Sequence, residues 1–134
     1  MRFQRSFSKA PWEQMVAYCR ALRADDMIFV TGTTALGERG EVVGPGDAYA
    51  QTRHCLEIID TSLRELGADL TCVVRTRMFV TDIARWEDYG RAHRDCFANH
   101  PPATTMVEIS RLIHPDMLIE IEADAIVPAD AEKS

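Results

Sequence analysis

The chain has 134 residues, enough for one substantial hydrophobic core but not for two, so we expect a single domain over residues 1–134. Its net charge of −6 disfavours binding to nucleic acid or to anionic membranes, and no apolar run approaches the roughly 20 residues that span a bilayer. The four cysteines form no C-x-x-C pair and no apolar signal-peptide core is present, which predicts reduced thiols and a cytoplasmic location.

Short strands are predicted at the start of the chain. Residues 2–7 alternate weakly between apolar and polar side chains, and residues 9–12 are expected to turn. Residues 18–23 and 27–31 are predicted to form a β-hairpin, since the run MIFV is β-branched and aromatic. Residues 32–46 hold five of the seven glycines and are predicted to be a loop.

Helices and strands alternate in the rest of the chain. Asp47 to Leu66 is predicted as a helix because one apolar stripe recurs at three- and four-residue spacing, namely Cys55, Leu56, Ile59, Leu63 and Leu66. Residues 70–81 alternate as a strand, and residues 83–99 form a second predicted helix that ends before two prolines. Residues 101–127 are predicted to hold two further strands, the second with a clean period of two from residue 117 onward.

The last strand carries a row of carboxylates on the face opposite its apolar residues. Glu120, Glu122 and Asp124 share this face, and Arg75 and Arg77 share one face of the strand over residues 70–81. If the two strands are neighbours, the arginines and carboxylates are expected to pair across the sheet.

The order of elements predicts an α+β fold, with one mixed β-sheet and two helices packed on one of its faces. The other sheet face mixes the charged residues with apolar ones, which makes it too apolar to be left open to water: Val73, Phe79, Leu118 and Ile126. We therefore expect self-association through that face, most economically in a closed ring.

Four segments carry a family resemblance: Ile28–Gly32, Val73–Asp82, Pro102–Leu112 and Ile119–Ala123. They resemble the RidA/YjgF family of reactive-intermediate deaminases, also described as endoribonuclease L-PSP-like, and the likeness covers nearly the whole chain. The resemblance implies a chorismate-mutase-like fold and a homotrimer whose sheets form a central barrel, with three clefts between subunits that each bind a small molecule. It also implies hydrolysis of enamines or imines to a carbonyl product and ammonia, without a metal or an organic cofactor.

The resemblance assigns expected roles to single residues. The cleft tyrosine of the family falls on Tyr18, its strand-end serine on Thr31 and its water-positioning, catalytic glutamate on Glu120. The arginine that clamps a substrate carboxylate in the family is replaced by Thr104, and the frequent cysteine two residues later is replaced by Met106. These five residues, together with Arg20, are the predicted site.

The missing arginine predicts a substrate other than a simple 2-imino acid, because a threonine hydroxyl cannot make the bidentate contact of a guanidinium. Arg20, two residues after Tyr18 on the same predicted strand, is one candidate replacement. The other interpretation of Arg20 is a solvated surface or inter-strand residue. For Glu120 the alternative role is an ion pair with Arg75 or Arg77.

Three functions remain open at the level of the sequence. The first is an imine or enamine hydrolase with an unusual substrate, and the second is a non-catalytic small-molecule-binding or regulatory trimer. The third is RNA cleavage, against which the acidic charge and the lack of a basic stripe count. His93 and His100 have no matching Ser or Cys nucleophile pattern and are not predicted to be catalytic.

Overall fold

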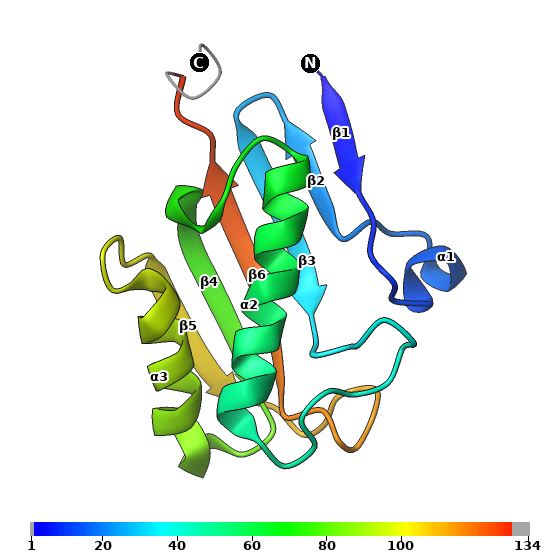
Figure 1. Ribbon diagram of the computed structural model, residues 1–134, viewed down its shortest axis with the longest axis vertical. Helices are drawn as coiled ribbons and strands as arrows, with labels where there is room; N and C mark the ends of the chain where they lie inside the picture. Colours follow the sequence, from blue (N-terminus) through cyan, green and yellow to red (C-terminus); the bar gives the residue numbers. More distant parts are fainter. Residues whose placement is uncertain (1, 130–134) are drawn as a thin grey trace.

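A computed structural model describes residues 2–129 of the chain as one six-stranded sheet with helices (Figure 1). Its elements in chain order are β1 (Phe3–Ser6), α1 (Trp12–Val16), β2 (Ala21–Ala24), β3 (Met27–Thr33), α2 (Ala48–Glu65), a 3-10 turn (Leu70–Cys72), β4 (Val73–Val80), a second 3-10 turn (Ile83–Arg85), α3 (Trp86–Phe97), β5 (Ala103–Glu108) and β6 (Ile119–Ile126). None of the helices among these residues is long and apolar enough to cross a membrane.

The strand order β1-β2-β3-β6-β4-β5 makes a mixed sheet in which β4 and β5 alone run parallel. Helices α2 and α3 lie side by side over one face of this sheet (Figure 1). A parallel pair needs a long crossover, and α3 supplies it between β4 and β5. The predicted α+β fold with two helices on one face is therefore confirmed.

Helix α2 forms where the sequence predicts it, and it provides much of the core. Asp47 caps its first turn by accepting a hydrogen bond from the amide of Ala50 at 2.9 Å. Every residue of the predicted apolar stripe is buried: Cys55, Leu56, Ile59, Leu63 and Leu66. Each such side chain stabilises the fold by about 1.5–3 kcal/mol relative to an exposed one.

Strand β6 is central and lies between β3 and β4. Its alternate residues Ile119, Ile121 and Ala123 are buried against the helices, which confirms the predicted period of two. The carboxylates between them face the other side of the sheet, away from α2 and α3. We call this surface the open face.

The segment before β2 differs from the prediction. Residues 9–12 were expected to turn and residue 18 to begin a strand, whereas helix α1 starts at Trp12 and β2 starts only at Ala21. Helix α1 ends at Val16, and the next residue, Ala17, adopts a left-handed backbone with φ of 72°. Tyr18 therefore lies in the connection between α1 and β2, so its predicted place on the same strand as Arg20 is wrong.

Candidate functional site

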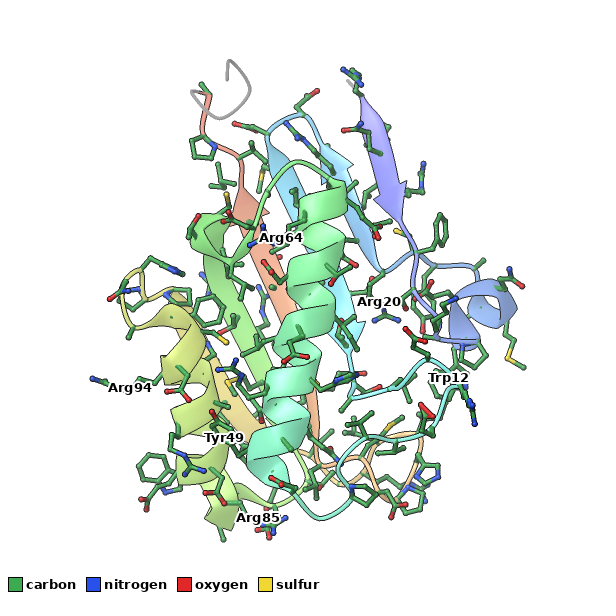
Figure 2. The ribbon with its side chains drawn as sticks, viewed as in Figure 1. Trp12, Arg20, Tyr49, Arg64, Arg85 and Arg94 are labelled. Atoms are coloured by element: carbon green, nitrogen blue, oxygen red, sulfur yellow. The ribbon has the colours of Figure 1, made fainter. Side chains whose placement is uncertain are left out.

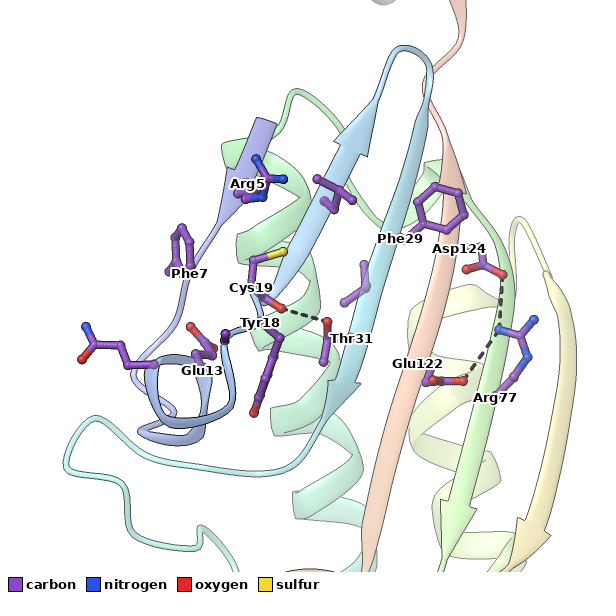
Figure 3. A pocket seen from close by; sticks show the side chains of 14 residues that line it. Arg5, Phe7, Glu13, Tyr18, Cys19, Phe29, Thr31, Arg77, Glu122 and Asp124 are labelled. Carbon is purple, nitrogen blue, oxygen red and sulfur yellow. Dashed lines mark hydrogen bonds and ion pairs between the residues drawn. The ribbon is translucent and has the colours of Figure 1, made fainter. Parts of the chain in front are cut away.

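A cavity of about 650 Å³ lies on the open face, between the α1–β2 connection and the strands β1, β3, β4 and β6 (Figure 3). Tyr18 and Thr31 both line it, as expected for two residues of one site. The Thr31 hydroxyl donates a hydrogen bond to the carbonyl oxygen of Cys19 at 2.8 Å. This bond ties the end of β3 to the segment that carries Tyr18.

Arg77 neutralises most of the carboxylate row. Its Nη1 lies 3.3 Å from a carboxylate oxygen of Asp124 and 3.8 Å from one of Glu122 (Figure 3). The pairing follows from the register of β4 and β6, in which Arg77 lies opposite Glu122. The prediction that the arginine and carboxylate strands are neighbours is confirmed, and these two carboxylates are bound by an ion pair that is partly exposed to solvent.

Glu120 is the carboxylate that the arginines do not reach. The register places Phe79 opposite it, so the alternative role as partner of Arg75 or Arg77 is wrong. Among residues 2–129 its half-buried carboxyl group has no hydrogen-bond or ion-pair partner. A polar group in that position is costly to bury unless something else binds it.

Burial is the main cause that raises the pKa of Glu120 above its ordinary value, and the charge of Glu122 adds to the increase. The positive charge of Arg20 lowers the same pKa in part. A carboxyl group accepts a proton as the carboxylate and donates one as the acid, and a raised pKa makes the acid form easier to reach. Glu120 therefore has the chemistry of a general acid or base.

Arg20 is buried and fully engaged, so its interpretation as a solvated surface residue is wrong. Its Nη2 lies 3.0 Å from a carboxylate oxygen of Glu13, and both side chains are at most 4% exposed. Its Nη1 donates to the carbonyl oxygen of Gly32 at 2.7 Å and to the hydroxyl of Thr33 at 3.2 Å. Figure 2 shows Arg20 between α2 and the segment that carries Trp12.

Thr104 and Met106 lie on the opposite face of the sheet from Glu120. The Thr104 hydroxyl is 2.8 Å from that of Thr76, a fully buried residue beneath the helices. Met106 is paired with Met78 and packs against the core on the same side. Within one chain the predicted site is thus split into an open-face group and a group at the β5 edge.

His93 is a residue of the β5-edge group that the sequence reasoning missed. Its Nε2 is 2.9 Å from the hydroxyl of Thr76 and 3.4 Å from that of Thr104. Burial lowers the pKa of His93 to about 4, so the ring is neutral at pH 7. Where an arginine was expected by resemblance, the chain has an uncharged hydrogen-bonded cluster, which we call the Thr104 cluster (Thr76, His93 and Thr104).

Known proteins resemble this chain over most of its length. The family model described as endoribonuclease L-PSP matches residues 8–127. A Mycobacterium tuberculosis protein described as a member of the YjgF/YER057c/UK114 family has a solved structure with a TM-score of 0.85 and 42% sequence identity, covering 94% of this chain and all of that one. The 3-aminoacrylate deaminase RutC of Acinetobacter baylyi is 36% identical over 84% of this chain and 89% of its own. A RutC family protein of Pyrococcus abyssi is 36% identical over 87% of this chain and 91% of its own.

Proposed function

The chain belongs to the RidA/YjgF family, whose model is described as endoribonuclease L-PSP, and on that premise we propose that it hydrolyses a reactive imine or enamine to a carbonyl compound and ammonia. The observation that carries the proposal is the Glu120 carboxyl group, half-buried beside the cavity face with no partner among residues 2–129 and with a raised pKa. A relative that is 36% identical is described as a deaminase, which supports the same reaction class.

The reaction needs one group that moves a proton in both directions. As a carboxylate, Glu120 accepts a proton from water while the water oxygen bonds to the imine carbon and the C=N π electrons move to nitrogen. As a carboxylic acid, it then returns that proton to nitrogen and gives a carbinolamine. The carboxylate next takes the hydroxyl proton of the carbinolamine and delivers it to nitrogen, so that the C–N bond breaks, ammonia leaves and the carbonyl forms. Water, imine, carbonyl and ammonia balance without a further reactant.

The substrate is proposed to be one whose recognition does not need a carboxylate clamp. The Thr104 cluster is uncharged, and the guanidinium of Arg20 is already bound to Glu13. Arg77 is engaged by the carboxylate row. Neutral hydroxyl and imidazole groups suit a ligand that presents uncharged donors or acceptors.

A matched pair of substrates tests this specificity. We expect the wild type to accelerate hydrolysis of an imine made in situ by an amine oxidase from an amine without a carboxylate. We expect little acceleration of the 2-imino acid made by an amino-acid oxidase. Thr104→Arg should gain activity on the imino acid, with KM about tenfold lower or more, because a charge-assisted hydrogen bond is worth about 1.5–3 kcal/mol. The readout is ammonia released above the spontaneous rate.

Two results would argue against the proposed specificity. A wild type that is already fast on the imino acid shows that Thr104 does not limit the substrate. A wild type inert on both imines, with Thr104→Arg inert as well, favours a non-catalytic small-molecule-binding trimer. This second candidate is supported by Thr104 and Met106, which stand where the resemblance implies an arginine and a cysteine.

A homotrimer is part of the proposal because the predicted site is split in one chain. Thr104 lies at the β5 edge on the helix side, whereas Glu120 lies on the open face. A second copy that covers the open face would allow the two groups to face one cleft. That face exposes apolar side chains that a partner would bury: Phe29, Val74, Val107 and Ile126.

Light scattering in solution tests the assembly. We expect a mass three times that of the 15.1 kDa chain. Phe29→Glu, which puts a charge on the centre of the open face, should shift the mass toward that of the single chain, because a buried unpaired charge opposes association. A wild type that remains at the mass of one chain at micromolar concentration would contradict the shared cleft.

A further inference from the structure

We propose that Gly32 is a positioning residue that seats the Glu120 carboxyl group, and that the buried Glu13–Arg20 ion pair holds Gly32 in place for this purpose. The inference rests on the proposed function, since it concerns the carboxyl group assigned there to proton transfer. It adds two features to the proposed reaction. The first, which we call the seat, is the space beside Gly32 that the Glu120 carboxyl group occupies. The second, which we call the brace, is the Glu13–Arg20 pair that binds the carbonyl oxygen of Gly32.

Gly32 matters here because it has no side chain, and not because of its backbone conformation. Gly32 does not have a φ in the left-handed region, so its backbone is open to any residue. A Cβ added there would lie 2.7 Å from Cδ and 2.9 Å from Oε1 of Glu120, closer than real Cβ contacts. The carboxyl group of Glu120 therefore occupies the volume that a side chain at position 32 would fill.

The brace acts on the carbonyl group of the same residue. Arg20 donates to the carbonyl oxygen of Gly32 at 2.7 Å, and its other nitrogens bind Glu13 at 3.0–3.1 Å. Glu13 in turn accepts a hydrogen bond from the amide of Ser8 at 2.8 Å and another from the Ser8 hydroxyl. The ladder of β3 and β6 is irregular between Val30 and Thr33, so the backbone at Gly32 is braced by a side chain where regular pairing is interrupted.

The charges around Glu120 are consistent with this arrangement. Arg20 is the cation that favours its ionised form, and Glu122 on its own strand opposes that form. On α2 the neighbouring titratable group is the buried thiol of Cys55, which feels the charge of Glu120 and whose pKa is raised chiefly by burial. On β4 the side chain opposite Glu120 is the uncharged Phe79. Arg20 thus both binds the carbonyl oxygen of Gly32 and supplies the positive charge that favours the ionised form of Glu120.

Gly32→Ala tests the seat, with Gly90→Ala on α3 as a matched control because a Cβ at position 90 meets nothing within 4 Å. We expect both variants to fold with unchanged or slightly higher stability, since alanine restricts the unfolded chain. We expect kcat of Gly32→Ala to fall by about 100-fold with little change in KM, because a displacement near 1 Å can cost that much. Gly90→Ala should keep the wild-type rate.

A double variant separates a seat from a general defect. Glu120→Asp shortens the side chain and withdraws the carboxyl group from the added methyl group. In that background Gly32→Ala should therefore cost little further activity, although Glu120→Asp alone is slower than the wild type. Equal fold losses from Gly32→Ala in both backgrounds would overturn the proposal.

A readout independent of activity is the ¹³C NMR titration of the Glu120 carboxyl group. Gly32→Ala should move its chemical shift and titration midpoint, whereas Gly90→Ala should move neither. Arg20→Gln should raise the pKa of Glu120, and Glu13→Gln should lower it by leaving the charge of Arg20 unbalanced. An unmoved Glu120 signal in Gly32→Ala overturns the positioning role. If the NMR effects appear in a protein without hydrolase activity, the seat stands and the proposed function fails.

Discussion

Glu120→Gln is expected to reduce imine hydrolysis by about 100- to 10,000-fold, the range that a general acid–base group contributes. Glutamine keeps the size of the side chain but cannot accept a proton from water and return it to nitrogen. Because Glu120 has no hydrogen-bond partner among residues 2–129, the substitution should leave the fold intact. The measurement is kcat for ammonia release from the imine that the wild type hydrolyses fastest.

The control for this variant is Glu57→Gln, which neutralises an exposed carboxylate on α2 whose partner is His54 at 3.8 Å. It should retain the wild-type rate, since it changes the net charge by the same amount away from the open face. If Glu120→Gln is as active as Glu57→Gln, the proton carrier is another group and the proposed mechanism is wrong.

Glu13→Ala is expected to destabilise the protein by about 3–5 kcal/mol, because it leaves the buried guanidinium of Arg20 without its counter-charge. Both side chains of this pair are at most 4% exposed. The substitution also removes the acceptor of the Ser8 amide and hydroxyl. The free energy of unfolding is measured by urea denaturation of the wild type and the variant.

Asp88→Ala provides the matched comparison, since Asp88 pairs with Arg91 at 3.1 Å but both side chains are about half exposed. Removing that pair should change the unfolding free energy by about 1 kcal/mol or less, as is usual for surface pairs. Equal decreases in the unfolding free energy for Glu13→Ala and Asp88→Ala would mean that burial does not determine how much the Glu13–Arg20 pair stabilises the protein.

The elements with strong local patterns were predictable. Helix α2 has its apolar stripe, its cap at Asp47 and a glycine just after its end, and it lies within one residue of the expected bounds. Strand β6 has a period of two, which also places Glu122 and Asp124 together on one face. In both cases the information lies in residues close to one another in the chain.

Elements with weak local patterns were not predictable. Helix α1 has only five residues, too few for an apolar stripe to recur, and it was expected as a turn followed by a strand. The starts of the strand and helix expected at residues 70 and 83 are 3-10 turns instead, each capped by an aspartate side chain, Asp69 and Asp82. The aspartate side chain binds a nearby backbone amide and so favours a short turn over the start of a regular strand or helix.

The candidate site also has parts that the sequence predicts and parts that it does not. The sequence by itself, read through a family resemblance, indicated Tyr18, Thr31 and Glu120, and the structure places the first two on one cavity with Glu120 on the same sheet face. It also indicated the loss of the arginine at Thr104. The link of Thr104 to His93 depends on how α3 crosses β4 and β5, which no local pattern reveals.

Only the tertiary structure decided which charged residues are partnered. The register of β4 and β6 assigns Arg77 to Glu122 and Asp124 and leaves Glu120 opposite Phe79. The burial of Arg20 likewise arises where segments distant in the chain converge, because its guanidinium binds Glu13 of α1 and the carbonyl oxygen of Gly32 at the end of β3. Periodicity within a segment determines which face a residue takes. The desolvation and pairing that set its chemistry depend on neighbours that the chain brings together only on folding.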